Sequence, residues 1–257
     1  ITDKGIGNGM SLLIFTSIAA GFPASLWAIQ QRSGWDVFIG IILMGFVVIS
    51  LVVFVGQSQR RIPVQYAKRM VGRRVYGGTS TYIPLKVNMA GVIPVIFASS
   101  LMSLPMLLAQ FNQRADGNNA GWVDWINANL VTGDKPMYMA LYIGLILFFT
   151  FFYVSITFNP TEVADNMKKY GGFIPGIRAG RPTAEYLSYV LTRITVPGAI
   201  YLALISLIPL IALVLVDANQ NFPFGGTSIL IIVGVGLETV KQIEAQLQQR
   251  HYEGFLR

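Results

Sequence analysis

The chain has 257 residues, of which 53% are hydrophobic and only 12% are charged. Because soluble domains carry about 25% charged residues, this composition argues against a soluble globular protein. The net charge is +7, and the absence of cysteine excludes disulfide bonds and thiolate chemistry.

The charges are bunched, so that six segments of at least 20 residues carry no charge at all. A helix that crosses a bilayer needs roughly 20 predominantly apolar residues, and it satisfies its own backbone polar groups in lipid. We therefore predict an all-α, polytopic membrane protein, a bundle of six transmembrane helices. They cover about residues 10–29, 37–55, 87–108, 137–158, 191–216 and 227–240.

The first predicted helix contains Gly21-Phe22-Pro23, which we expect to interrupt it. A short turn over residues 30–36 leads to the second helix, which is apolar all round and typical of a lipid-facing span. Since the chain opens on Ile1 and enters a helix almost at once, we expect it to be part of a longer protein.

The loop over residues 56–86 carries seven basic residues and no acidic residue. Ile62, Val64 and Tyr66 alternate with polar neighbours, which predicts strands in a hairpin-like finger. Such a loop favours docking of an anionic partner. The alternative is that the charges only set the membrane topology and touch anionic lipid, at about 1 kcal/mol per basic residue.

The third predicted helix, residues 87–108, is rich in small, polar and helix-breaking residues. Small residues allow close helix approach, serines can hydrogen-bond across an interface, and proline eases bending. We interpret this helix as a moving contact, with static packing as the alternative.

The second half of the chain continues the alternation of spans and connections. We expect a short interfacial helix in the outer segment 109–136 and bulky aromatic packing in the fourth helix. The connection 159–186 contains a short amphipathic stretch and then FIPGIRAG, whose turn presents Arg178 outward for a carboxylate or phosphate. The fifth helix holds Pro197 and Pro209, and a charged tail over residues 241–257 follows the sixth.

The distribution of Lys and Arg predicts the orientation of the six spans. One side holds only Arg32, Arg114 and Lys135 of the 19 basic residues. By the positive-inside rule, the other side is cytoplasmic, with the loops 56–86 and 159–186 and the C-terminus.

No ionisable residue lies well inside any predicted span. This argues against ion-coupled transporters and pumps, which need such groups, and against intramembrane hydrolysis. We predict no enzymatic activity, no catalytic residue, no metal site and no cofactor. What remains is a passage lined by apolar side chains, which blocks ions by excluding water, or no passage at all.

Several ordered strings resemble the SecY family, the central subunit of the bacterial protein translocon. They are ITDKGIGNGMSLLIF, QRRIPVQYAKRMVGRRVYGG, STYIPLKVNMAGVIPVIFASS, FNPTEVADNMKKYGGFIPGIRAG and FGGTSILIIV. The resemblance implies a ten-helix inverted-repeat fold. Residues 1–29 would be the last helix of its N-terminal half, and residues 30–257 would be the C-terminal half with five helices.

The resemblance also implies roles for individual residues. Met10, Ile14, Ile96 and Ile231 match the positions of an apolar pore ring. The third and fourth helices would form the moving side of a lateral gate, with Asn88, Gly91, Pro94, Ser99 and Ser100. Cytoplasmic positions that engage the ribosome or the SecA motor are matched by Arg73, Arg74 and Arg178, and we extend this docking surface to Arg60, Arg61, Lys68 and Arg69.

The function implied is a channel in the bacterial plasma membrane that conducts unfolded secretory proteins across the bilayer and apolar segments sideways into it. The partners implied are SecE, SecG, the SecA motor ATPase, the ribosome, signal peptides and nascent chains, besides anionic lipids. Two alternatives stay open: a secondary transporter of a small neutral solute with broken helices, and a membrane scaffold with no passage.

Overall fold

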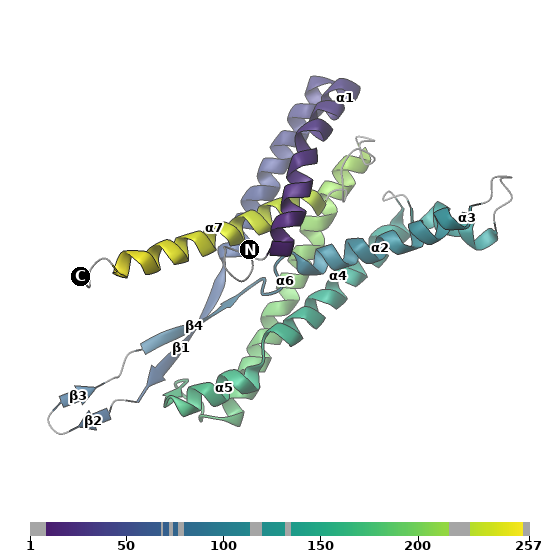
Figure 1. Ribbon diagram of the computed structural model, residues 1–257. Helices are drawn as coiled ribbons and strands as arrows, with labels where there is room; N and C mark the ends of the chain where they lie inside the picture. Colours follow the sequence, from purple (N-terminus) through teal and green to yellow (C-terminus); the bar gives the residue numbers. More distant parts are fainter. Residues whose placement is uncertain are drawn as a thin grey trace.

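The computed structural model describes residues 9–67, 69–71, 74–76, 80–113, 120–131, 135–215 and 227–253 (Figure 1). Seven helices and five short strands make up these residues. Four helical runs are long and apolar enough to cross a membrane: Gly9–Gln57, Ile93–Phe111, Pro136–Lys169 and Arg181–Ala212. The chain is a multi-pass helical membrane protein, as its composition predicts.

Helix α1 (Gly9–Gln57) is a hairpin of two helical arms that lie side by side (Figure 1). The fold occurs at Gly34, whose φ of 85° is accessible to glycine at no steric cost. Each arm exceeds the roughly 20 residues that a bilayer crossing needs, so α1 supplies the first two predicted spans. The predicted break at Gly21-Phe22-Pro23 is wrong, because helix continues through Pro23, and the predicted turn over residues 30–36 is confined to Gly34.

A narrow antiparallel finger extends from the end of α1 (Figure 1). Strand β1 (Gln59–Tyr66) pairs with β4 (Ser80–Lys86) in the register Gln59 to Lys86, and β2 (Arg69–Val71) pairs with β3 (Arg74–Tyr76) farther out. The apolar and polar residues that alternate along β1 are alternately buried and exposed, since Ile62 and Val64 are buried between exposed neighbours. The predicted hairpin is thus confirmed.

Helix α2 (Ile93–Phe111) begins six residues later than the predicted third helix. Pro94 lies in its first turn, where the missing N–H costs nothing, and the preceding residues 87–92 are irregular. Helix α3 (Gly121–Asn129) is the short helix predicted in the outer segment, and α4 (Pro136–Thr157) returns alongside α2 (Figure 1).

The last third of the chain consists of two long helices and a short connection. Helix α5 (Pro160–Lys169) starts at Asn159, whose side chain accepts a hydrogen bond from the Thr161 N–H, and it leads to β5 (Gly172–Phe173). Helix α6 (Arg181–Leu215) begins ten residues earlier than predicted and keeps Pro197 and Pro209 inside it. Helix α7 (Thr227–Glu253) covers the sixth predicted segment and much of the charged tail, but it is not among the four runs long and apolar enough to cross a membrane, so the sixth span stays a prediction.

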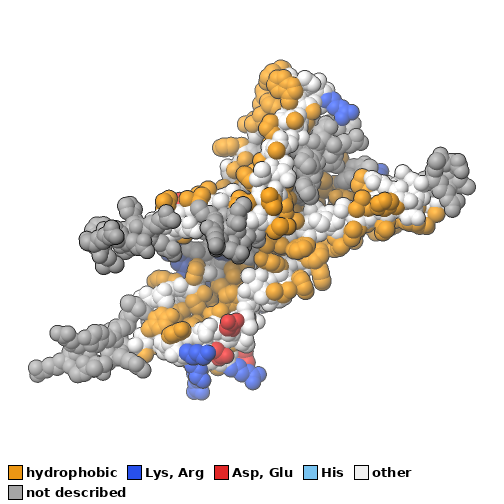
Figure 2. Space-filling model, viewed as in Figure 1, with side chains coloured by type: hydrophobic (Ala, Val, Ile, Leu, Met, Phe, Trp, Pro, Cys, Tyr) orange, Lys and Arg blue, Asp and Glu red, His pale blue; other side chains and the backbone are white. Residues whose placement is uncertain are grey.

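Two apolar cores hold these elements together. The larger joins α1, α2, α4, α6 and α7 around fully buried side chains such as Ile18, Tyr142 and Ile231. The smaller packs the base of the finger on α5 and α6. Figure 2 shows apolar side chains over much of the helical surface, and charged side chains near α5, which fits a protein that meets lipid with its helices.

Candidate functional site

The larger core contains three of the four residues predicted to form a pore ring. Ile231 on α7 is fully buried, while Ile14 on α1 and Ile96 on α2 are partly buried at the edge of the same cluster. Three isoleucines from three helices therefore belong to one apolar cluster. Met10 does not join them, because its side chain is 68% exposed one turn before Ile14.

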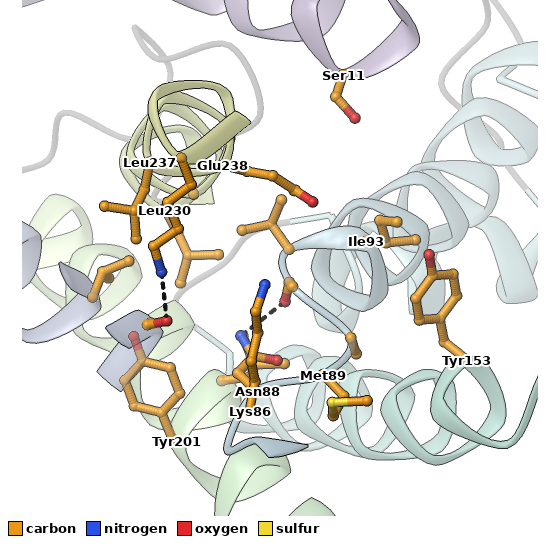
Figure 3. A pocket seen from close by; sticks show the side chains of 18 of the residues that line it. Ser11, Lys86, Asn88, Met89, Ile93, Tyr153, Tyr201, Leu230, Leu237 and Glu238 are labelled. Carbon is orange, nitrogen blue, oxygen red and sulfur yellow. Dashed lines mark hydrogen bonds between the residues drawn. The ribbon is translucent and has the colours of Figure 1, made fainter. Parts of the chain in front are cut away.

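A cavity of about 360 Å³ adjoins this cluster (Figure 3). Its wall comes from both ends of α1, from the irregular residues 87–92, and from α4, α6 and α7. Val52, Leu202 and Leu230 belong both to the cavity wall and to the apolar cluster. The cavity therefore shares part of its wall with the apolar cluster.

The cavity wall also carries charged side chains. Lys86 at the end of β4 and Glu238 on α7 extend their charged groups toward the same space (Figure 3). Lys241, one turn beyond Glu238, donates from Nζ to the carbonyl oxygen of Gly56 at 3.0 Å. Charged side chains remain solvated in a water-accessible space, so this part of the cavity can hold water.

The residues predicted for a lateral gate lie in the cavity wall (Asn88 and Gly91) and in α2 (Pro94, Ser99 and Ser100). Asn88 Nδ2 donates to the Gly91 carbonyl oxygen at 3.1 Å, and Asn88 Oδ1 is buried without a hydrogen-bond partner among the described residues. Gly91 has a φ of 63°. These two residues therefore form a local turn rather than the helix that the sequence predicted.

Ser99 and Ser100 do not hydrogen-bond across a helix interface, contrary to the expectation for this segment. Both hydroxyls donate to the Ile96 carbonyl oxygen of their own helix, at 2.9 and 2.8 Å. Pro94 is buried in the first turn of α2 rather than in its middle. The five residues lie within one stretch of chain, but their side chains make local contacts.

Two glycines that sequence reasoning passed over as site residues bring the cavity wall together. A Cβ on Gly198 of α6 would overlap the Val87 carbonyl oxygen, and a Cβ on Gly234 of α7 would overlap Val92 Cγ1. The segment 87–92 thus packs against a glycine at each end, Gly198 at Val87 and Gly234 at Val92. A glycine inside an apolar helix is the signal for such close approach, although its partner cannot be read from the sequence.

The predicted docking residues lie on the finger and on the connection after α5. Arg60 and Arg61 are exposed on β1. Arg69 and Arg74 lie in β2 and β3, whose side chains are not described, and Lys68 and Arg73 lie outside the described residues.

Arg178 is exposed in a turn with a fixed backbone. Thr183 Oγ1 donates to the Arg178 carbonyl oxygen at 2.8 Å. Gly176 and Gly180 have φ of 85° and 101°, a region that favours glycine. The turn holds the main chain and leaves the guanidinium in solvent, as the FIPGIRAG string predicts.

The finger and the Arg178 turn form one structural unit. Strand β5 extends the finger sheet by pairing Gln65 with Phe173, and the Ala67 N–H donates to the Gly171 carbonyl oxygen. Beneath the sheet, Val64 and Leu85 pack with Ile174 in the smaller core. The two basic loops therefore present their exposed arginines from a common base.

Comparison with known proteins places this arrangement in a family. A family model described as SecY matches residues 1–240. The protein translocase subunit SecY of Streptomyces galbus is 70% identical over 261 residues, which cover 100% of this chain and 59% of that protein. The subunits named SecY from Micrococcus luteus and Mycobacterium bovis are 61% and 59% identical, with the same coverage.

Solved structures agree on the fold. One described as the structure of a protein conducting channel matches with a TM-score of 0.62 at 20% identity, over 95% of this chain and 60% of that chain. A second, described by the plug domain that stabilises the closed state of the SecY translocation channel, matches equally well. The chain thus spans about three fifths of the length of these proteins, and it belongs to the SecY family.

Proposed function

We propose that this chain forms the C-terminal, pore-bearing part of a protein-conducting channel. The channel would pass unfolded secretory chains across the bacterial plasma membrane and release apolar segments sideways into the bilayer. The observation that carries the proposal is that Ile14, Ile96 and Ile231, from three helices, belong to one apolar cluster that shares wall residues with the cavity. An apolar constriction excludes water and ions, yet it offers a passing polypeptide no specific bonds that must be broken.

The finger and the Arg178 turn are the proposed docking surface for the partners that drive transport. Exposed arginines on a rigid base suit phosphates of ribosomal RNA or carboxylates of a motor protein. The docking surface and the C-terminal tail would face the cytoplasm, as the distribution of Lys and Arg predicts. The subunits SecE and SecG, the SecA motor and the ribosome are the partners that family membership suggests, besides signal peptides, nascent chains and anionic lipids.

The lateral gate is proposed at the boundary between α2 and α4 on one side and the remaining helices on the other. The irregular segment 87–92 joins α2 to the finger. It packs closely against Gly198 on α6 and Gly234 on α7. A segment that lacks regular hydrogen bonding can rearrange more easily than a helix. Asn88, Gly91, Pro94, Ser99 and Ser100 would take part through this segment and the first turns of α2.

A stalled secretory chain tests the channel directly. A photo-crosslinking residue is placed at Ile96 in the full-length protein, and another at Ile156, which is 65% exposed on α4, as a control. We expect the translocating chain to crosslink at Ile96 and not at Ile156. Saturable flux of a small solute without any crosslink at Ile96 would instead favour the transporter, and crosslinking at neither position without flux would favour the scaffold.

A further inference from the structure

One hydrogen bond joins two parts of the cavity wall that are distant in sequence. Lys241 Nζ on α7 lies 3.0 Å from the Gly56 carbonyl oxygen at the end of α1, across 185 positions in sequence. We infer that Lys241 is a positioning residue, which holds α7 against α1 at the root of the finger and so sets the width of the cavity mouth. The inference rests on the proposed channel function and adds a residue to which the family comparison assigns no role.

The end of α1 needs a partner of this kind. The last four carbonyl oxygens of a helix accept no hydrogen bond from within that helix. In α1, no basic residue in the last turn is present to interact with them. Ser58 satisfies two of these carbonyls, with its N–H donating to Val55 O and its hydroxyl to Phe54 O. Lys241 satisfies Gly56 and also places a cation at the negative end of the helix dipole, where it is favourable.

The joint between α7 and the end of α1 has a second contact, which is apolar. Gly56 faces Leu237 so closely that a Cβ would lie 2.9 Å from Leu237 Cδ2. Leu237 and Lys241 are four residues apart, and therefore lie on one face of α7. Helix α7 thus meets Gly56 through an apolar contact and, one turn later, through a hydrogen bond from a charged donor.

The position of Gly56 makes this joint more than a packing contact. Strand β1 of the finger begins three residues later, and the Val87 N–H at the other end of the finger donates to Ser58 O at 3.1 Å. Helix α7 carries Ile231 in the proposed ring and Gly234 beneath Val92. A force on the finger would therefore reach α7 through Gly56 and Lys241, and the segment 87–92 through Ser58 and Val87.

Matched lysines in the same cavity allow a clean test. Lys241→Met keeps an apolar stem but removes the donor, and Lys241→Arg keeps both charge and donors. Lys86→Met is the control, because Lys86 lines the same cavity and its ammonium makes no hydrogen bond within the described residues. These 257 residues contain no cysteine. Spin labels on cysteines introduced at the exposed positions Ser50 on α1 and Gln246 on α7 report the joint in the full-length protein, after any cysteine outside these residues has been replaced by serine.

We expect Lys241→Met to broaden the distance distribution between the labels and to add a longer population. A hydrogen bond from a charged donor shifts such an equilibrium about tenfold or more. Lys241→Arg should restore the parent distribution, and Lys86→Met should leave it unchanged. An unchanged distribution in Lys241→Met, or an equal change in Lys86→Met, would overturn the inference.

The functional readout uses the same variants in proteoliposomes. Lys241→Met should increase ion leak several-fold with ribosome binding unchanged, and Lys241→Arg should reverse the leak. Parent-like leak and transport in a Lys241→Met protein with altered distances would show that the joint does not position the pore. If the parent protein itself passes no unfolded chain, the channel proposal fails, while the distances still decide whether Lys241 holds α7.

Discussion

Val92 packs onto Gly234 so closely that no side chain can replace the hydrogen of that glycine without displacing the valine. Val92 ends the irregular segment before α2, and Gly234 lies one turn beyond the proposed ring residue Ile231 on α7. The two sides of the proposed pore are thus in contact at a point where only the smallest residue fits. This contact makes the relation between α2 and α7 sensitive to a single methyl group.

Gly234→Ala is expected to destabilise the protein or to displace α2 from α7. Overpacking a fitted contact costs about 1–3 kcal/mol, and valine has little rotamer freedom with which to escape. Thermal unfolding of the full-length protein in detergent measures the cost. Gly236→Ala is the control, since a Cβ there would lie 4.0 Å from Phe15 Cε2 and be accommodated.

A second substitution decides whether Val92 is the cause. Val92→Ala removes the atoms that the new methyl group meets, so the double variant should recover most of the stability lost in Gly234→Ala. Coupling of this kind is expected only between residues in contact. If Gly236→Ala were as damaging as Gly234→Ala, the effect would come from the helix and not from this contact.

The contact between Val87 and Gly198 is expected to tolerate substitution of its glycine less well than the contact between Val92 and Gly234. A Cβ at Gly198 would meet the Val87 backbone carbonyl, which no side-chain rotation can relieve. Gly198→Ala should therefore lower thermal stability more than Gly234→Ala does, and Val87→Ala should not rescue it. Gly144→Ala on α4, where nothing lies within 4 Å, is the control and should be neutral or slightly stabilising. Rescue by Val87→Ala would show that the side chain, not the carbonyl, sets the limit.

The sequence predicted the apolar segments and the strands of the finger because both follow from periodicity and charge. It placed α4 and α5 well, since Pro136 and the pair Asn159-Pro160 mark helix starts chemically. It misjudged Pro23, which was expected to interrupt a helix but remains inside one, as Pro197 and Pro209 do in α6, where they were expected; neighbouring groups can satisfy the freed backbone. A proline therefore predicts a helix end less reliably in an apolar membrane helix than in a helix of a soluble protein.

The site was only partly predictable for a different reason. Ile14, Ile96 and Ile231 were found through resemblance, and the cluster that they share is built from helices that are distant in sequence. The start of α2 was misplaced because Asn88 and Gly91 form a local turn, which apolar composition does not reveal. The Lys241–Gly56 bond has no local signature at all, since its partners lie at opposite ends of the chain.

Serine at Ile14 and Ile96 is expected to open the channel to ions. Both side chains are only partly buried, so we expect their replacement to cost less than about 2 kcal/mol of stability each. Hydroxyl groups should let water wet the constriction and raise conductance in planar bilayers. Ile156→Ser, on an exposed face of α4, makes the same chemical change away from the constriction. Conductance that rises equally in all three variants would remove Ile14 and Ile96 from the ring.

Charge reversal at Arg178 is expected to weaken docking in a salt-dependent way. The guanidinium is exposed on a fixed turn, and exposed charges act over about 30 Å at 0.01 M salt but only about 10 Å at 0.1 M. Arg178→Glu should reduce ribosome binding about tenfold at low salt and less at high salt. The control is Arg181→Glu, since Arg181 is equally solvated but already paired with Glu185 at 3.0 Å. Equal losses in both variants would indicate a general field rather than a contact by Arg178.

Val64 offers a test of whether the finger and the Arg178 turn act as one docking unit. Its side chain is 1% exposed and packs with Leu85 on the finger, and with Ile174 beside the turn. Val64→Ala should cost roughly 1–3 kcal/mol locally, by leaving a cavity beneath the sheet. Hydrogen exchange at the amides of β1 and β5 should quicken, and ribosome binding should fall although no charge has changed.

Tyr82→Ala provides the comparison for Val64→Ala, because Tyr82 is 56% exposed on the same sheet and contributes no atoms to that core. It should leave both exchange and binding near the parent values. The difference in ribosome binding between the two variants measures the effect of sheet rigidity, because neither variant changes the charge. If Val64→Ala loosens the sheet and binding stays intact, then the arginines act independently, and the shared base serves folding rather than docking.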